Sequence, residues 1–335
     1  MKIVIPGGTG QLGRILARAF EAGGHRVVIL GRSAGAGVVP WDGETIGPWA
    51  DELSGADAVI NLAGRSVNCR YSETNLREML DSRVRSTAVV GLAIARARRP
   101  PRVWLQMSSA TIYAHSLDRD QDELTGVFGG DEPGVPAYWK YSVDIARSWE
   151  AALDAAPTPH TRKVALRTAM VMSPDAGGVL DVLCGLVRRR VGGPAAGGRQ
   201  YVSWIHDHDF VRAVDFLIAR DDLAGPINVC APGPLPQREH MAILRRALGV
   251  RVGLPATRWM LSVGAWAMRS DPELLLKSRR VVPGRLRAAG FGFVHAGWES
   301  AAADLVARWR AARGDHARAQ APALIQPPPT TRSPS

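Results

Sequence analysis

Four hydroxyl side chains lie within residues 108–113, and hydroxyls can orient a carbonyl or an alcohol and pass on a proton. They belong to Ser108, Ser109, Thr111 and Tyr113. The preceding residues, 103–107, are mostly apolar and are typical of a buried strand. Because ligands bind at the carboxyl ends of the strands in an open α/β sheet, Ser109 is expected to face a substrate. The alternative is that these hydroxyls only cap or turn the chain.

A glycine-rich turn near the N-terminus has residue types suited to binding phosphate. It lies between a strand-like segment and a segment with helical apolar spacing, and a second β-branched segment follows. The N–H groups and partial positive charge at the start of such a helix attract a dinucleotide pyrophosphate, and this context favours a nucleotide site over a purely structural turn. The residues expected to contact the dinucleotide are Gly7, Gly8, Thr9, Gly10, Gln11, Leu12 and Gly13.

Arg32 follows the second predicted strand, where that strand should end beside the adenosine ribose. An acid at this place would accept a hydrogen bond from the ribose 2′-hydroxyl, whereas an arginine suits a 2′-phosphate. The sequence therefore favours NADP over NAD as the cofactor. The alternative is that Arg32 is merely a solvated surface side chain.

Length and composition exclude several classes of protein. A chain of 335 residues can form more than one domain, and 46% hydrophobic with 22% charged residues is ordinary for a globular protein. The net charge of +11 comes from scattered arginines without an aromatic–basic motif, so no nucleic-acid partner is expected. No membrane segment is expected either, because the apolar runs are too short. Cys69, Cys184 and Cys230 have no paired spacing, which fits a reducing cytoplasm and neither disulfides nor zinc.

Strand-like and helix-like segments alternate along the chain, which predicts an α/β protein with a Rossmann-type, doubly wound parallel sheet. The expected NAD(P)-binding domain covers residues 1–172, and residues 201–230 return to it. Residues 173–313 are expected to form a smaller C-terminal α/β region on the substrate side, and residues 314–335 a disordered tail rich in Ala, Pro, Thr and Ser.

Residues 206–209, His-Asp-His-Asp, have the types of side chain that ligate metals. Successive residues at the start of a helix point in different directions, and helix capping explains the acids. No metal site is therefore expected here.

Separated motifs along the chain resemble one protein family. The glycine spacing and the Ser-Ser-Ala-x-x-Tyr run at 108–113 resemble the extended and atypical short-chain dehydrogenase/reductases. Four further segments narrow the resemblance to an epimerase-like family, of the NAD-dependent epimerase/dehydratase type, with a C-terminal appendage of unknown function. They are residues 192–194, 203–206, 231–232 and 275–293. The resemblance extends from Lys2 to Leu305.

The resemblance implies roles for several residues. Asn61, Ala63 and Gly64 would lie beneath the cofactor, and Ser109 would be the catalytic serine. Arg83 falls on the cofactor side, where extended relatives carry an asparagine of a proton relay. The Tyr-x-x-x-Lys pair of the family is absent, and counting back from Trp149 puts Lys140 in the place of the tyrosine and Asp144 in that of the lysine. The residues considered for the catalytic function are Tyr113, Tyr138, Tyr141 and Lys140.

Two functions follow from this resemblance. The first, which we favour, is an NADP-dependent oxidoreductase or sugar-nucleotide-type epimerase that acts on an unidentified small molecule. The second is a nucleotide-binding regulatory or sensor protein with weak or no catalysis, because the catalytic pair is missing. The sequence leaves open a homodimer.

Overall fold

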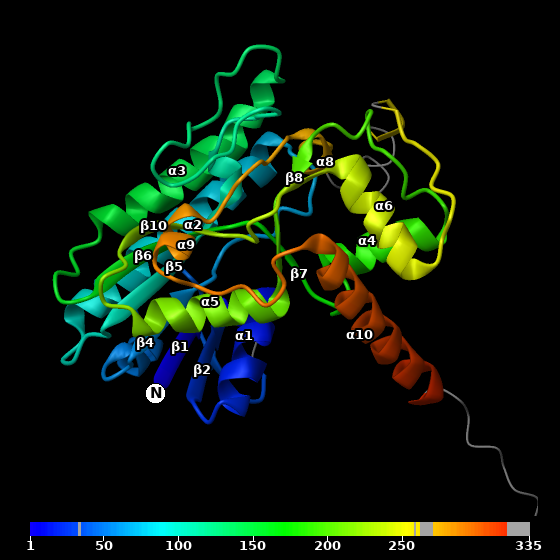
Figure 1. Cartoon of the computed structure of the whole chain (residues 1–335). Coiled ribbons are helices and arrows are strands. Elements are labelled where there is room, and N and C mark those ends of the chain that lie inside the picture. The colour runs from blue at the N-terminus through cyan, green and yellow to red at the C-terminus, as the bar shows by residue number, and fades with distance from the viewer. Residues whose placement is uncertain (33–34, 258, 262–270, 320–335) are drawn as a thin grey trace, which may run out of the picture.

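The central element of the computed structural model is a seven-stranded parallel sheet, with strand order β10-β6-β5-β4-β1-β2-β3 (Figure 1). The structure describes residues 1–32, 35–257, 259–261 and 271–319. The seven strands are β1 (Lys2–Pro6), β2 (Arg26–Gly31), β3 (Val38–Pro40), β4 (Ala58–Asn61), β5 (Val103–Ser109), β6 (Arg162–Thr168) and β10 (Gly225–Val229). The order reverses at β1, with β4 on one side and β2 on the other. The predicted doubly wound α/β fold is confirmed.

Helices cover both faces of this sheet because alternate strand residues bury apolar side chains on each face. Helices α1 (Gln11–Ala22) and α5 (Asp207–Ala219) pack on one face, where Ile3 and Ile5 join their core. Helices α2 (Glu73–Arg96) and α3 (Lys140–Ala155) cover the other face, where Val4 and Trp104 are buried. The 3-10 helix η1 (Pro48–Leu53) also packs there.

The C-terminal region has a core of its own, in which Trp204 and Trp298 pack with ring centroids 4.8 Å apart. Two small two-stranded sheets, β7 with β9 and β8 with β11, belong to this region. Its elements are β7 (Met170–Met172), α4 (Val179–Arg188), β8 (Tyr201–Val202), β9 (Trp204–His206), β11 (Leu235–Pro236), α6 (Gln237–Leu248), α8 (Glu273–Leu276) and α10 (Trp298–Ala319). The remaining helix, α9 (Gly284–Ala288), packs on the large sheet.

The segment between α8 and α9 returns from the C-terminal region to the first domain (Figure 1). Val281 forms a parallel bridge with Gln121, and the backbone N–H of Arg279 donates to Tyr201 O at 2.9 Å. Helix α9 then packs next to β10, where Leu286 joins the core of the first domain. The 279–281 segment therefore contacts parts of the chain that are far from it in sequence.

Helix α4 ends at Arg188, because Arg190 has a left-handed backbone conformation with φ of 62°. One boundary differs from that predicted from the sequence. Helix α10 continues through Ala319, past the predicted start of the tail at residue 314, since alanine and arginine favour helix. Residues 320–335 lie outside the described residues. Among the helices that are described, none is long and apolar enough to span a bilayer.

Burial of His240 makes the stability of the C-terminal region depend on pH. Its ring stacks on Trp298 with centroids 4.1 Å apart, its Nε2 has no partner, and burial lowers its pKa to about 3. The unfolded chain therefore binds a proton near the ordinary pKa of 6.5 that the folded chain does not bind. The contribution of His240 to stability is fully present above the ordinary pKa of 6.5 and is lost as the pH falls toward about 3, its pKa in the folded chain.

We expect this single group to remove about 2 kcal/mol of unfolding free energy between about pH 7 and about pH 5. Urea unfolding of the wild type and of His240→Phe at both pH values measures the effect, because the phenyl ring stacks on Trp298 without titrating. Identical losses in the two proteins would show that His240 does not cause the pH dependence.

Candidate active site

A cavity of about 480 Å³ opens at the carboxyl ends of the central strands. Its walls come from the glycine turn, the loop after β4, the end of β5, one face of α3 and the 274–279 segment. The lining residues include Gly7, Gly10, Gln11, Gly64, Tyr71, Arg83, Ser108, Ser109, Ser142, Ala146 and Arg279. The topology predicts a ligand site at this place, where the strand order reverses.

The glycine turn is packed so closely that side chains cannot replace its hydrogens. Gly7 has φ of 75°, and a Cβ on it would lie 2.7 Å from the Ala63 backbone. A Cβ on Gly13 would lie 2.3 Å from Gly8 O, so glycine at this position brings α1 against the turn. The turn and the loop after β4 therefore approach each other at the cavity wall.

The start of α1 fits the pyrophosphate of a dinucleotide. No side chain caps this helix, whose N-cap residue is Gly10. Gln11 lines the cavity, and its buried Nε2 has no hydrogen-bond partner. Unpaired backbone N–H groups at a helix start, with a polar side chain beside them, form an anion site. Leu12 also lines this wall, whereas Gly8 and Thr9 do not.

The other residues expected at the cofactor occupy different positions. Asn61 is fully buried, donates to Gln106 Oε1 at 2.9 Å and accepts from the Ala63 N–H at 3.1 Å, so it shapes the loop beneath the cavity. Gly64 lines the cavity, and Ala63 does not. Arg32 is exposed at the end of β2 and makes no hydrogen bond or ion pair with any described residue. That position leaves its guanidinium accessible to a 2′-phosphate.

Arg83 lies on the cavity wall, although it is buried. Its guanidinium lies 4.8 Å from the centroid of the Trp149 ring and donates to Met79 O at 2.9 Å. Burial lowers the pKa of Arg83 to about 10, which leaves the side chain charged near neutral pH. An anionic part of a ligand in the cavity would meet this positive charge.

Ser109 occupies the place that the sequence predicts. It ends β5 and lines the cavity, and its Oγ accepts a hydrogen bond from the Thr111 N–H at 3.1 Å. The capping alternative therefore also holds, because this bond begins the 3-10 helix η2 (Ala110–Ile112). Ser108 also lines the cavity and donates to Glu150 Oε1 at 2.6 Å.

Tyr113 lies outside the cavity, in a buried polar network. Its hydroxyl donates to Asn228 Oδ1 at 2.9 Å and accepts from Arg167 Nη1 at 2.9 Å. Burial raises the pKa of the phenol. The arrangement connects three strand ends and leaves the hydroxyl without contact to the cavity.

We expect Tyr113→Phe to lower the free energy of unfolding by about 1–3 kcal/mol, because the buried partners lose a hydrogen bond. NADPH affinity should stay the same, which calorimetry can measure beside urea unfolding. If this variant kept its stability and lost turnover, Tyr113 would be a catalytic residue after all.

The structure does not bring Tyr138, Tyr141 or Lys140 to the cavity. Tyr138 and Tyr141 are exposed, and Lys140 Nζ pairs with Asp131 at 3.3 Å and more weakly with Asp144 at 4.0 Å. These residues lie at the solvent-facing start of α3. The predicted places of Lys140 and Asp144 as substitutes for the catalytic pair are not supported by this geometry.

The face of α3 that lines the cavity consists of Ser142, Ile145, Ala146 and Trp149. A tyrosine and a lysine one turn apart would need two positions four residues apart, and this face has two such pairs, Ser142 with Ala146 and Ile145 with Trp149. The α3 wall therefore offers one hydroxyl and neither a phenol nor an ammonium group.

Glu273, the first residue of α8, supplies a carboxyl group behind the Ser142 hydroxyl. Ser142 Oγ donates to Glu273 Oε2, and Glu273 is fully buried, with no hydrogen bond to its Oε1. Burial is the largest cause of a raised pKa of Glu273, and the positive charge of Arg279 acts in the opposite direction. A raised pKa makes a carboxyl group a better proton donor at a pH where an ordinary carboxyl group is ionised.

Two cations flank this carboxyl. Lys277 Nζ lies 4.0 Å from Glu273 Oε1 and donates to Thr111 O at 2.9 Å, and burial lowers its pKa to about 8. Arg279 donates from Nε to Thr111 Oγ1 at 3.0 Å and lines the cavity. The 277–279 segment thereby attaches to η2, next to Ser109.

Tyr71, just before α2, also lines the cavity, although no motif in the sequence indicates it. Burial, and then the negative charge of Glu273, raise the pKa of its phenol. The spacing of Glu273 and Lys277, four residues apart, was visible in the sequence as an ion pair. Nothing local indicated that this pair faces Ser142, which is more than a hundred residues away in the chain.

A sequence profile described as the NAD dependent epimerase/dehydratase family matches residues 3–230 of the chain. The chain belongs to this family. A second profile, a domain of unknown function called DUF1731, matches residues 257–305 and includes Glu273, Lys277 and Arg279. The resemblance noted from the motifs is thus confirmed, and the family is of the NAD(P)-binding short-chain dehydrogenase type.

Family members of similar length include the human epimerase family protein SDR39U1, which is 30% identical over 296 residues that cover 88% of this chain and 95% of that protein. The epimerase family protein MT2273 of Mycobacterium tuberculosis is 32% identical over 298 residues, which cover 88% and 93%.

Among solved structures, human SDR39U1 (isoform 2) with NADPH matches with a TM-score of 0.80 at 28% identity, covering 92% of this chain and 99% of that one. A nucleoside-diphosphate sugar epimerase from Corynebacterium glutamicum matches with a TM-score of 0.69 at 22% identity, covering 96% and 68%. The latter likeness shows the fold alone.

Proposed function

We propose that this family member is an NADP(H)-dependent oxidoreductase or epimerase that acts on the carbonyl or alcohol group of a small molecule. One observation carries the proposal. A single cavity joins an uncapped helix start, suited to a pyrophosphate, to a wall of hydroxyls with a buried carboxyl behind it. Catalysis needs a cofactor site and an acid–base group in reach of one another.

The cofactor would be held by the glycine turn, by Gln11 and by the N–H groups at the start of α1. Arg32 would bind the 2′-phosphate, which supports NADP over NAD. The human relative SDR39U1 was solved with NADPH, which supports the same choice. When bound, this cofactor supplies or takes up a hydride.

Calorimetry with NADPH and with NADH tests this choice. We expect the wild type to bind NADPH more tightly than NADH, and Arg32→Ala to lose about 10- to 100-fold in NADPH affinity, since a charge-assisted hydrogen bond contributes about 1.5–3 kcal/mol. NADH affinity should hardly change. Arg26→Ala is a matched control, because Arg26 is exposed at the other end of β2 and does not line the cavity. Equal affinities of the wild type for both cofactors would refute the role of Arg32.

The acid–base step would use Ser142 and Glu273. In reduction, the substrate oxygen takes a proton from Ser142 Oγ, which takes the carboxyl proton of Glu273 and leaves a carboxylate. Lys277 would stabilise that carboxylate, because its ammonium lies 4.0 Å away. Ser109 would orient the substrate oxygen from the end of β5. The reverse sequence serves oxidation.

The function itself is tested by incubating the protein and NADP(H) with a panel of ketones, enones and sugar nucleotides. We expect turnover with one of these classes, reduced by Ser109→Ala. The second candidate, a nucleotide-binding sensor, is favoured by the absence of a phenol and an ammonium from the α3 wall. NADPH binding without turnover on any class would favour the sensor.

A further inference from the structure

A second cavity, of about 410 Å³, lies between α1, α5 and α10. It shares no lining residue with the candidate active site. Its wall contains three histidines and two aspartates, together with two arginines, from segments far apart in the chain. They are His206, His208, His295, Asp207, Asp304, Arg18 and Arg308.

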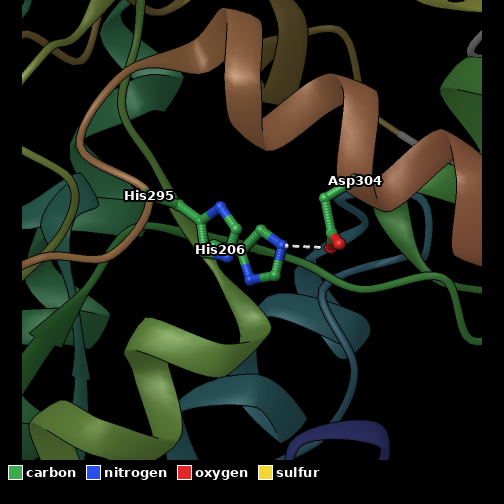
Figure 2. A group of neighbouring side chains, drawn as sticks. All are labelled: His206, His295 and Asp304. Carbon is green, nitrogen blue, oxygen red and sulfur yellow. Dashed lines mark hydrogen bonds and ion pairs between the residues drawn. The ribbon is translucent and has the colours of Figure 1, made fainter.

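Three of these side chains lie together, with His206 facing Asp304 and the ring of His295 stacked on that of His206 (Figure 2). One donor atom each of His206, His295 and Asp304 lies within 4.8 Å of the other two. His206 Nε2 and Asp304 Oδ2 are 3.0 Å apart. Two imidazoles with one carboxylate form a donor set that suits borderline divalent ions such as Zn²⁺, and water can complete the shell from the open cavity.

Contacts behind the three donors hold two of them in place. His206 is buried at the end of β9, and its Nδ1 lies 3.0 Å from Asp207 Oδ1. With its proton on Nδ1, the ring donates to this carboxylate, and the lone pair of Nε2, which faces Asp304, is available to an ion. The backbone N–H of His295 donates to Oδ2 of the buried Asp209 at 2.7 Å, and that of Val294 to Oδ1 at 3.0 Å. Such supporting hydrogen bonds are characteristic of metal ligands.

Arg308 is the cation that would compete with a metal. It binds Asp207 through both amino groups, at 2.7 and 2.9 Å, and lies farther from Asp304, at 3.3 Å. Asp207 therefore retains Arg308, and Asp304 is available to an ion.

The two rings must also move to share an ion. They are stacked, with centroids 3.7 Å apart and planes 13° from parallel, whereas a metal lies in the plane of each imidazole that it binds. His206 is buried, so the partly exposed His295 is the ring that turns.

We propose that His206, His295 and Asp304 bind one divalent ion of the Zn²⁺ type, with His295 rotating out of its stack on His206. Consecutive residues of the 206–209 run do not form this donor set. Asp207 contacts Arg308 and His206 Nδ1, Asp209 accepts from the 294–295 backbone, and the helix N-cap is His206 itself. The partners of His206 come instead from the loop before α10 and from α10.

Calorimetric titration of the full, tag-free chain with Zn²⁺ after chelator treatment tests the proposal. We expect one ion per chain, and losses of at least about 10- to 100-fold in affinity for His295→Ala and for Asp304→Asn. The matched control is His208→Ala, an exposed histidine in the same cavity, which should bind as the wild type does. Co²⁺ should give the visible spectrum of a mixed nitrogen and oxygen site, and His295→Ala should remove it.

Absence of binding, or equal losses for all three variants, would overturn the proposal. Thermal unfolding and NADPH affinity of each variant show that its fold persists, and His295→Ala, on a loop, remains informative if Asp304→Asn does not fold. These outcomes do not depend on whether the protein turns over a substrate.

Discussion

Ser142→Ala and Glu273→Gln are each expected to lower NADPH-dependent turnover by about 10²- to 10⁴-fold, the range typical of a general acid–base group. Both changes remove the proton path in the cavity wall, since Ser142 Oγ contacts Glu273 Oε2. Affinity for NADPH should hardly change, because neither residue belongs to the glycine turn. Steady-state kinetics on the substrate found with the panel, beside calorimetry, measure the two quantities.

The pH profile distinguishes an acid–base role from a structural one. Burial raises the pKa of Glu273, and its protonated form is the one that donates in reduction. Reduction should therefore slow as the pH rises through that raised pKa, and oxidation should speed up. Glu273→Gln should lose this dependence. Tyr141→Phe is the control on the exposed side of α3 and should behave as the wild type does. Unchanged turnover in Ser142→Ala would contradict the proton path.

Arg167→Met is expected to lower the free energy of unfolding by about 3–5 kcal/mol, because it leaves a buried carboxylate without its partner. Arg167 donates to Glu150 from Nε and Nη2 at 2.9 and 2.7 Å, and both side chains are largely buried. Glu150 also accepts from Ser108, so the pair supports the end of β5 beside the cavity. Urea unfolding measures the loss.

A double variant, Arg167→Met with Glu150→Leu, is the control for this interpretation. With both charges removed, no buried charge is unpaired, so the double variant should be more stable than the sum of the two single losses predicts. Simple additivity, or a loss below about 1 kcal/mol in Arg167→Met, would show that the pair contributes little.

The sheet and its helices could be predicted because their signals are local. The apolar runs of β1, β4 and β5 are typical of strands buried on both faces, and the glycines of the first turn meet the steric demands of the β1–α1 connection. Helix ends were less predictable, as α10 shows, since alanine and arginine extend a helix beyond its packed face.

The parts of the candidate site that could be predicted from the sequence are those formed by a single short motif. Ser109 and the glycine turn lie in single βα units, and topology places both at the cavity. Which face of α3 lines the cavity depends on how the helix packs, and spacing along the sequence does not show this. The sequence therefore indicated Lys140, whereas Ser142 lines the cavity. Glu273 reaches the site through a long-range contact of the C-terminal segment, which no local pattern encodes.

A crystal structure of the complex with NADPH tests both the cofactor site and the proton path. We expect the 2′-phosphate at Arg32, the pyrophosphate at the start of α1, and the nicotinamide ring between Ser109 and Ser142, with Glu273 behind Ser142. A nicotinamide bound away from both serines, or a 2′-phosphate without contact to Arg32, would contradict this expectation.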